Sequence, residues 1–381
     1  MAVDVGGTFT DVFVLDEETA QIRVGKVPST PDDPGRAVLQ AAQSVDVDLR
    51  DVVLFSHGTT VATNALITRR FPPAAMVTTT GFRDVIEIRD GTKDDLWDAY
   101  KDVAGPYIRR RDRYEVTERI DYNGAELVPL DEAQAREVAG KLRKKGIKTV
   151  AVCFANSYAN GDHERRMKEI LEEELPGVRV STSSEILPEI FEHDRFSTTV
   201  ANAVLAPLVG DYVQELGNNL RAGGYAGDLL LLHSGGGSMT DRMVQKYAVR
   251  LAASGIAAGA IACRHLAAEA GFPNAIGLDM GGSSTDITLR RLAIALWDWS
   301  NTSVNSPTGS RNRYVRKTNP IIAPAVSPEP GPRATPTETT PQMHSTENTS
   351  PDGKRNAPRR EALTYDFVRL RIRVRMRAAR W

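Results

Sequence analysis

Short apolar runs alternate with longer amphipathic stretches along roughly the first 290 residues, a pattern typical of strands that take turns with helices. In the first half, strands are expected at 1–5, 10–15, 52–56, 74–78, 149–154 and 178–180. Helices are expected at 35–44, 130–145 and 163–175, and after the turn 57–60 as far as residue 67. The charged segment 84–122 is interpreted as an insertion outside the core.

The second half follows the same alternation. A long helix is expected at 196–220 and a helix rich in small residues at 254–270, with strands at 229–232 and 275–278. No repeat with a period of roughly 20–50 residues is visible, which argues against a solenoid. The pattern therefore predicts an α/β fold in which helices cover a parallel or mixed sheet.

The composition changes near residue 290. Residues 1–289 hold 31 Lys and Arg against 42 Asp and Glu, a net charge of −11, whereas residues 290–381 hold 17 against 7, a net charge of +10. Between residues 301 and 358, Ser, Thr, Pro, Asn and Arg dominate, and such a segment buries too little apolar surface to offset its ordering entropy. We therefore expect a folded part followed by a basic tail, 290–381, that is disordered or non-native.

Whole-chain composition excludes several classes of protein. A net charge of −1 over 381 residues is not that of a nucleic-acid-binding chain, and no apolar run is long enough for a transmembrane helix. The N-terminus lacks the basic and apolar regions of a signal peptide, and Cys153 and Cys263 are too few for a disulfide framework or a Cys-based zinc site. We expect a cytoplasmic protein without a nucleic-acid or membrane partner, although the alternating arginines at 369–377 leave a basic binding arm as an alternative.

One motif occurs twice. The pattern Asp-x-Gly-Gly-x-x-x-Asp runs from Asp4 to Asp11 and again from Asp279 to Asp286, 275 residues later. Each copy follows an apolar run, so each predicts a strand, a glycine turn and a returning strand. A single copy is compatible with an ordinary hairpin, but two copies with paired aspartates are harder to explain structurally.

The repeated motif suits a nucleotide. Glycines allow the backbone to approach a phosphate closely, turn N–H groups can point at its oxygens, and a strand-end carboxylate can hold Mg²⁺ through water. Neither copy is a Walker A motif, because no Gly-Lys-Ser/Thr follows, and adjacent glycines exclude a Rossmann fingerprint. Two facing hairpins would clamp the phosphates of one nucleotide between them.

The chain resembles the hydantoinase A/oxoprolinase family. The resemblance covers about three quarters of the chain and is carried, in the family's order, by 4–11, 56–66, 79–84, 197–203, 234–237, 254–259 and 278–286. It implies an ATPase fold of the actin, sugar-kinase and heat-shock-chaperone type, with ribonuclease-H-like sheets. It also implies an N-terminal domain at 1–195 and the start of a hydantoinase A domain at 196–289, so that the second ATPase domain is incomplete.

The resemblance further implies an ATP-dependent hydrolase that opens a cyclic amide of the 5-oxoproline or hydantoin type by phosphorylating its carbonyl oxygen. A hydantoinase B-type subunit is the expected partner, and a homo-oligomer is left open. Two alternatives remain: a subunit of an ATP-dependent acetone or acetophenone carboxylase, and a non-catalytic fragment.

By position in the family's motifs, the resemblance also implies site residues. Asp4 and Asp279 are expected to hold Mg²⁺, and Asp11, Asp286 and His57 are the candidate catalytic residues. The candidate ATP-binding residues are Gly6, Gly7, Thr8, Thr10, Gly281, Gly282, Ser283, Ser284, Gly235 and Gly236. Structural alternatives stay open for Asp11 and Asp286, which could only hold their turns, and for His57, which could be a core residue.

Overall fold

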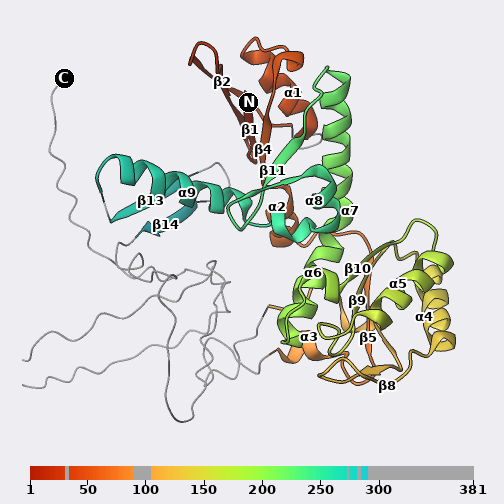
Figure 1. Cartoon of the computed structure of the whole chain (residues 1–381). Helices are drawn as coiled ribbons and strands as arrows, with labels where there is room; N and C mark the ends of the chain where they lie inside the picture. The colour runs from red at the N-terminus through yellow and green to blue at the C-terminus, as the bar shows by residue number, and fades with distance from the viewer. Residues whose placement is uncertain (31–33, 90–103, 273, 281–284, 291–381) are drawn as a thin grey trace, which may run out of the picture. The chain divides into compact units, whose positions relative to one another are not determined.

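The computed structural model describes residues 1–30, 34–89, 104–272, 274–280 and 285–290. Within them the chain forms an α/β fold with mixed sheets, as the alternation predicts (Figure 1). The predicted tail, 290–381, lies outside the described residues except for Arg290.

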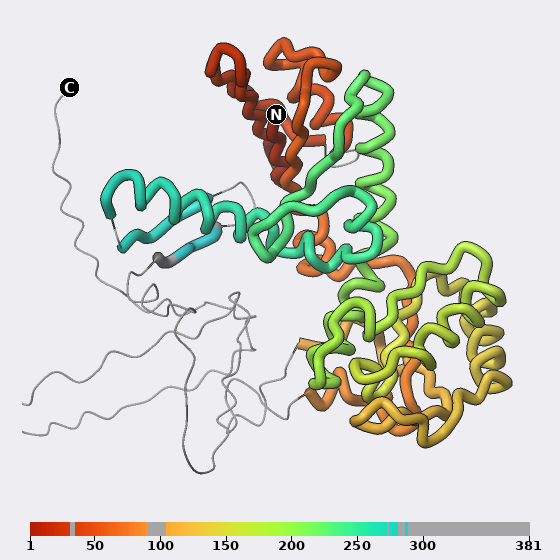
Figure 2. The backbone as a smooth tube through the Cα atoms, viewed as in Figure 1, coloured from red at the N-terminus to blue at the C-terminus, as the bar shows by residue number. Residues whose placement is uncertain are grey.

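The first sheet joins segments from both halves of the sequence. Its strand order is β12-β11-β4-β1-β2-β3. The strands are β1 (Ala2–Val5), β2 (Phe9–Leu15), β3 (Ile22–Pro28), β4 (Phe55–Thr59), β11 (Leu229–Leu232) and β12 (Ser238–Thr240). In Figure 2 the red N-terminal strands lie beside the green segment that contains β11, which pairs in parallel with β4. The sheet therefore joins strands from before and after residue 195, and the predicted domain boundary there stays a prediction.

Period-two burial fixes the faces of this sheet. Val3, Val5, Val12 and Val14 are buried on one face, where α1 (Pro34–Ser44) packs across β1, β2 and β3. The residues between them, among them Asp4, point to the opposite face. The alternation that predicted strands thus also separates a core face from a polar face.

The second sheet is parallel throughout, with the order β10-β9-β5-β6. It consists of β5 (Ala74–Thr79), β6 (Arg113–Val116), β9 (Thr149–Cys153) and β10 (Arg179–Thr182). Every residue of β9 is buried: Val150 and Val152 pack with α4 (Glu132–Lys144) and α5 (Asp162–Glu174), whereas Ala151 and Cys153 join the core on the other side. Four of the five residues of β9 are apolar, as burial on both faces favours, and the fifth, Thr149, has its hydroxyl hydrogen-bonded.

Helix α7 (Glu192–Ala222) contacts β9 and β10 of the second sheet. It also contacts α1, which covers the first sheet, and α2 (Val61–Thr68). It contains Pro207, which has no N–H to donate to the carbonyl of Ala203. The Thr149 hydroxyl donates to that carbonyl at 2.7 Å inside the core. A side chain of the central strand thus replaces the hydrogen bond that proline removes.

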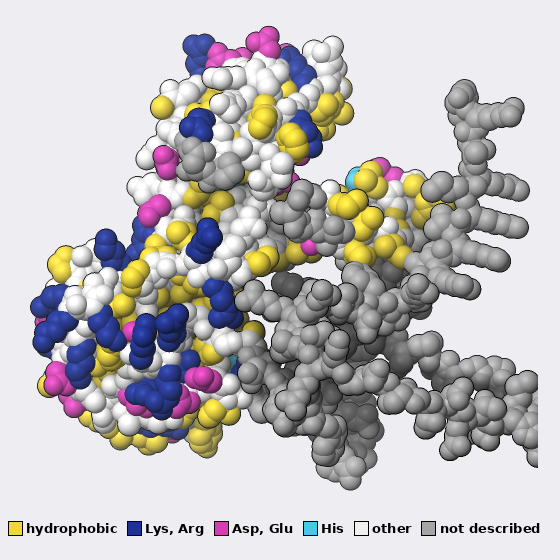
Figure 3. All heavy atoms as spheres, turned by 180° about the vertical axis from the view of Figure 1, so that it is seen from behind, with side chains coloured by type: hydrophobic (Ala, Val, Ile, Leu, Met, Phe, Trp, Pro, Cys, Tyr) yellow, Lys and Arg dark blue, Asp and Glu magenta, His cyan; other side chains and the backbone are white. Residues whose placement is uncertain are grey.

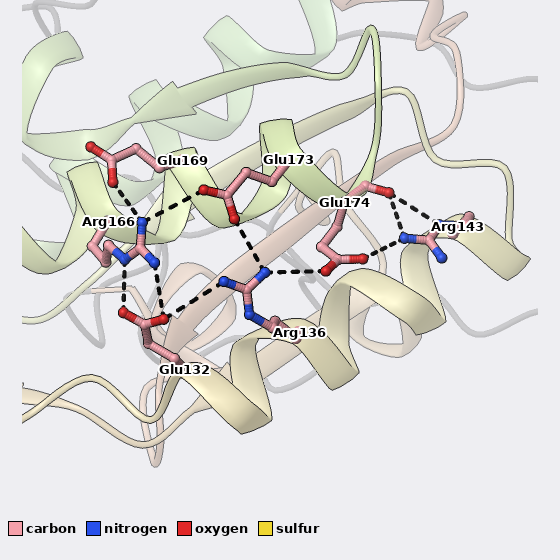
Figure 4. A network of polar contacts seen from close by, with 7 residues as sticks. All are labelled: Glu132, Arg136, Arg143, Arg166, Glu169, Glu173 and Glu174. Carbon is pink, nitrogen blue, oxygen red and sulfur yellow. Dashed lines mark hydrogen bonds and ion pairs between the residues drawn. The ribbon is translucent and has the colours of Figure 1, made fainter.

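An ion-pair network ties α4 to α5 at the surface. Arg136 contacts Glu132, Glu173 and Glu174, and Arg166 contacts Glu132, Glu169 and Glu173 (Figure 4). Arg143 bonds both the carboxylate and the backbone carbonyl of Glu174. Because these side chains are largely solvated, each pair contributes little, and the buried contacts between the helices carry most of the stability.

Short helical segments and a small hairpin complete the part of the chain that the structure describes. They are α3 (Val85–Ile88), α6 (Ser183–Ile186), α8 (Asp241–Lys246), the 3₁₀ turns at Leu49–Asp51, Arg110–Asp112 and Ala248–Leu251, and the pair β7 (Arg119–Ile120) and β8 (Glu126–Val128). The last elements are α9 (Ser254–Glu269) and the hairpin of β13 (Ala275–Met280) with β14 (Thr285–Arg290).

Two sequence predictions were wrong. The strand expected at 52–56 begins only at Phe55, because pairing with β1 starts where Ala2 meets Ser56, so Val53 is 84% exposed and His57 lies within the strand rather than in a turn. The segment 84–122 is not wholly an insertion either. It supplies β6, which pairs in parallel with β5 although its sequence is strongly charged.

Replacing Thr149 with Val should destabilise the fold by about 1–2 kcal/mol, because the Ala203 carbonyl loses its buried donor. The cost should shrink when Pro207 is also replaced by Ala, which restores a helical donor to the same carbonyl. Urea unfolding of the two single variants and the double variant measures this coupling. Equal costs of Thr149→Val in both backgrounds would contradict the compensation.

Candidate functional site

The repeated motif forms two hairpins of the same register. Asp4 lies opposite Asp11 across β1 and β2, and Asp279 lies opposite Asp286 across β13 and β14. Residues directly opposite each other in an antiparallel pair project from the same face. The motif spacing therefore places two carboxylates on one face of each hairpin.

Carboxylates from both hairpins border one cavity of about 480 Å³. Asp4 and Asp11 come from the first hairpin and Asp279 from the second. Between them α9 presents Gly255, Ala258, Gly259 and Ala262, which share one helix face by their i, i+3, i+4, i+7 spacing. Asp286 is half-buried and is not among the lining residues of this cavity.

Gly58 makes room for the Asp4 carboxylate. It lies beside Asp4 in the parallel pairing of β1 with β4. A Cβ at this position would come within 2.7 Å of the Asp4 Oδ1 atom, closer than any real contact. Any larger residue must therefore displace the carboxylate.

The charge in the cavity is poorly balanced. Desolvation, and then the negative charges of Asp11 and Asp279, raise the pKa of Asp4 above its ordinary value, although solvent reaches the side chain. Asp11 has a cation within reach, because Lys26 Nζ lies 2.9 Å from its Oδ1 atom. Among the described residues, neither Asp4 nor Asp279 has an ion pair. The site thus carries surplus negative charge that a bound cation would offset.

The first glycine turn is only partly available to a ligand. The N–H group of Gly6 donates to the carbonyl of Phe9 at 3.0 Å, whereas Gly7 and Thr8 are exposed. Thr10 is fully buried, and its hydroxyl lies 3.0 Å from that of Ser29, which in turn donates to the Gly6 carbonyl at 2.8 Å. The Thr10 hydroxyl therefore supports the turn through Ser29, and its contact with a phosphate stays a prediction.

The second glycine turn, Gly281, Gly282, Ser283 and Ser284, lies outside the described residues. The strands on either side of it are described, and Asp279 is exposed on β13. Whether these four residues contact a phosphate stays a prediction.

His57 lies on the core side of β4. Its Nδ1 atom donates to the Val3 carbonyl at 3.1 Å, and its Nε2 atom lies 2.6 Å from the Tyr212 hydroxyl, which donates to it. Burial lowers the pKa of His57 to about 4, so the ring is neutral near pH 7. Since both ring nitrogens are engaged away from the cavity, the geometry supports the structural alternative, and the catalytic prediction gains no support.

The glycine segment 235–237 closes the hairpin between β11 and β12 around the His233 ring. The Gly235 N–H donates to His233 Nδ1 at 3.0 Å, and Gly236 has φ of +83°, which favours glycine. Gly236 borders a neighbouring cavity of about 290 Å³ that shares Leu232, Ala258 and Ala262 with the aspartate cavity. Its role toward a nucleotide stays a prediction.

The donor set fits Mg²⁺ better than a metal that needs an all-protein cage. No group of three or more His, Cys, Asp or Glu side chains able to hold a metal occurs among the described residues. Mg²⁺ is usually held by one or two carboxylates together with waters and substrate phosphates. Asp4 and Asp279, which repel each other across the cavity, provide such a pair.

Sequence reasoning missed part of the cavity wall. Gly58 and the small-residue face of α9 line the site, yet neither was selected as functional. The predicted strand 52–56 ends before Gly58, whereas β4 runs from Phe55 to Thr59 and pairs Gly58 with Asp4. Because side chains alternate along a strand, Ser56 and Gly58 then share the face of Asp4. The clustering of Gly255 and Gly259 on one helix face was legible in the sequence.

Comparison with known proteins identifies the family. The hydantoinase/oxoprolinase N-terminal region matches residues 1–175, and the hydantoinase/oxoprolinase model matches residues 195–302. The chain belongs to the hydantoinase/oxoprolinase family. The resemblance drawn from the motifs is thereby confirmed.

Relatives extend this finding. An uncharacterised protein of Methanocaldococcus jannaschii is 37% identical over 74% of this chain and 42% of its own length. Caprolactamase subunit alpha of Pseudomonas jessenii is 35% identical over 76% of this chain and 43% of its own length. The crystal structure of that ATP-dependent caprolactamase has a TM-score of 0.66, at 34% identity, with 76% of this chain and 43% of that one covered.

A nucleotide-free acetone carboxylase structure shares the fold, with a TM-score of 0.70 at 24% identity over 76% of this chain and 43% of that chain. This chain therefore spans less than half the length of the relatives that it matches. In the described part, no helix combines the length and the apolar character needed to cross a membrane.

Replacing Asp4 with Asn should raise the melting temperature of the ligand-free protein near pH 7. The folded state raises the pKa of Asp4, so ionisation of this group opposes folding above that pKa, and Asn removes the effect. The gain should fade as the pH falls through the raised pKa of Asp4 and should be lost below the ordinary aspartate pKa of 3.8, where Asp4 is protonated in both states.

Melting curves from pH 4 to pH 8 measure this difference, with Glu215→Gln on an exposed position of α7 as the matched neutralisation. A gain that does not depend on pH, or an equal gain in Glu215→Gln, would show that Asp4 is not under electrostatic strain.

Proposed function

We propose that this chain supplies the ATP-binding part of a hydrolase that opens a cyclic amide, of the 5-oxoproline, hydantoin or lactam type. The observation that carries the proposal is the convergence of Asp4, Asp11 and Asp279 from two like hairpins on one cavity. Family membership and an ATP-dependent caprolactamase as a 34% identical structural relative support it.

In the proposed reaction, hydrolysis of ATP drives the opening of the cyclic amide. The carbonyl oxygen of the cyclic amide attacks the γ-phosphorus, the bond to the β–γ bridging oxygen breaks, and ADP leaves. A first water adds to the activated carbon, the ring C–N bond breaks and the nitrogen takes a proton, which leaves an acyl phosphate. A second water hydrolyses the acyl phosphate to the carboxylate and inorganic phosphate. In such transfers the protein acts mainly by positioning and charge neutralisation.

The chain's own residues have defined tasks in this proposal. Asp4 and Asp279 hold Mg²⁺, which when bound neutralises phosphate charge, and Gly58 keeps the space that the Asp4 carboxylate occupies. Exposed Gly7 and Thr8 contact phosphate oxygens, whereas Thr10 keeps the turn in shape. Asp11, bound to Lys26, and Asp286 orient the paired strands or the attacking group.

The two hairpins also support assignment to the actin-like ATPase class. In this proposal the first sheet, with its antiparallel β3-β2-β1 side and parallel β1-β4-β11 side, is one of two related sheets. The hairpin of β13 and β14 begins the second.

A separate hydantoinase B-type subunit is the proposed partner, because the caprolactamase relative is named as a subunit alpha. A ketone carboxylase subunit is the second candidate, favoured by the fold shared with acetone carboxylase.

The deciding assay supplies Mg·ATP with 5-oxoproline, hydantoin or caprolactam, and separately with acetone and bicarbonate, in the presence and absence of a B-type subunit from a relative. Ring opening coupled to phosphate release in equal amounts supports the proposal. Carboxylation of acetone alone would favour the second candidate, and no nucleotide binding would leave a non-catalytic fragment.

Gly58→Ala should weaken Mg·ATP binding at least about tenfold, because the new Cβ displaces the Asp4 carboxylate. Gly140→Ala is the matched control, since a Cβ there meets nothing within 4 Å and alanine favours the interior of α4. Calorimetric titration measures both affinities. Unchanged Mg·ATP affinity in a folded Gly58→Ala protein would show that the Asp4 carboxylate does not contribute to binding.

A further inference from the structure

A separate cavity of about 440 Å³ lies at the open edge of the second sheet. Strand β10 ends the order β10-β9-β5-β6, and among the described residues no strand pairs with its outer side. Helix α5 packs on one face of this sheet, whereas α7, with α8 packed on it, lies on the other (Figure 1). The cavity is lined from both faces and has the volume of a small-ligand pocket.

The outer edge of β10 presents main-chain groups to this cavity. The Arg179 N–H donates to the Lys148 carbonyl, just before β9, at 2.9 Å. Because hydrogen bonding alternates along a paired strand, the N–H and the carbonyl of Val180 then point away from β9. Val180 lines the cavity, so a ligand there meets one main-chain donor and one main-chain acceptor.

Asn202 of α7 holds the wall of the cavity in place. This side chain is 1% exposed, and its Nδ2 atom donates to Ser181 Oγ and to the Lys246 carbonyl, both at 3.0 Å. Its Oδ1 atom accepts from the Val249 N–H at 3.0 Å. Asn202 thus ties β10 to the end of α8. It belongs to the segment 197–203, to which the proposed reaction gives no task.

Ser181 adds a buried donor to the wall. It is 7% exposed and lines the cavity. Its oxygen accepts from Asn202, and no acceptor among the described residues receives its own proton. A buried hydroxyl that still has a proton to donate favours a ligand that accepts it.

Charge by itself does not mark a site on this surface. Figure 3 shows Lys and Arg side chains gathering on the part built around the second sheet, with Asp and Glu side chains among them. At the cavity, too, several charges are paired with each other. Glu185 lies 3.8 Å from Lys168 and 3.2 Å from Lys246, and Arg179 lies 2.6 Å from Asp211.

One cation and one carboxylate of the lining are left over. Arg242 and Glu172 have no ion-pair partner in the part of the chain that the structure describes. Arg242 belongs to α8 and Glu172 to α5, so they approach the edge of the sheet from opposite faces, with Val180 between them. The cavity therefore offers a positive side, a negative side and main-chain hydrogen bonds in the middle.

We propose that this cavity binds a linear amino acid. The carboxylate of the ligand contacts Arg242 and accepts from the Ser181 hydroxyl and the Val180 N–H. Its ammonium group contacts Glu172 and donates to the Val180 carbonyl. Charge-assisted hydrogen bonds of this kind are the strong ones, and both ends of the ligand receive them.

The proposed reaction makes such a molecule. Opening a cyclic amide releases an amine and a carboxylate in one product, whereas the closed ring has no ammonium group. The cavity shares no lining residue with the aspartate cavity, so a product bound here leaves the phosphate site free. The identification of the ligand as the product rests on the proposed function, but the amino-acid site itself does not.

The experiment is a calorimetric titration of the full chain without nucleotide, with L-glutamate and with 6-aminohexanoate. Their closed forms, 5-oxoproline and caprolactam, are the matched ligands that lack the ammonium group. At least one linear amino acid should bind at least about tenfold more tightly than its own closed form. Binding should persist in Asp4→Ala, so the result does not depend on whether the chain binds ATP or opens a ring.

Arg242→Gln and Glu172→Gln should each weaken this binding at least about tenfold, because each leaves one charged end of the ligand without its partner. Arg109→Gln and Glu215→Gln are the matched controls, since both side chains are exposed and lack an ion pair within the described part. Arg242 and Glu172 are exposed as well, so the melting temperature should not change.

Four results would overturn the proposal. They are no binding of either amino acid up to about 10 mM, equal affinity for the closed forms, loss of binding in Asp4→Ala, and an effect of Arg242→Gln without one of Glu172→Gln. The third would place the ligand in the aspartate cavity, and the fourth would make this a site for simple anions. Amino-acid binding with these variant effects but without ring opening would support the site and contradict only the proposed function.

Discussion

Mutual repulsion of carboxylates around one cavity is the constraint from which the site follows. Partial desolvation and the nearby charges of Asp11 and Asp279 raise the pKa of Asp4, and among the described residues only Asp11 of these three has an ion-pair partner, Lys26. A fold keeps such charge at a cost to its stability unless a bound cation offsets it. Gly58 and the small residues of α9 leave room around these carboxylates, which is a binding arrangement rather than a packing one.

The scaffold makes this arrangement rigid on one side. Buried valines seat β1 and β2 on α1, the hydroxyl of Thr10 braces the turn, and His57 locks β4 to α7 through Tyr212. Helix α7 also packs on β9, where the Thr149 hydroxyl donates the hydrogen bond that Pro207 cannot donate to the Ala203 carbonyl. The second hairpin lacks the corresponding helix and edge strand in the described part of the chain, so the two copies of the motif are supported unequally.

Much of the fold was predictable because its signals are local. Residue patterns within single segments predict β1 and β2 by their period-two alternation, α4 by its amphipathic spacing and β9 by its apolar run. Pairing partners are not local: β4 was misplaced because the run Val52–Phe55 looks like a strand, while its true position is set by pairing with β1. Charged β6 was missed for the same reason, since its strand character comes from β5.

For the site, the spacing of the aspartates was sufficient to place Asp4 opposite Asp11 and Asp279 opposite Asp286. It could not show which face His57 takes, because a shift of the strand by one residue reverses every side chain. It also could not show that Gly58 borders Asp4, a contact between residues 54 positions apart.

The central claim is that Asp4 and Asp279, from separate hairpins, act on one ligand. The most direct test is a double-mutant cycle on the Mg·ATP-induced rise in melting temperature, with Asp4→Ala, Asp279→Ala and both together. We predict that each single substitution removes most of the rise and that the double variant loses little more, because either loss already breaks the shared site. No rise in the unsubstituted chain, or losses that simply add, would contradict a common site.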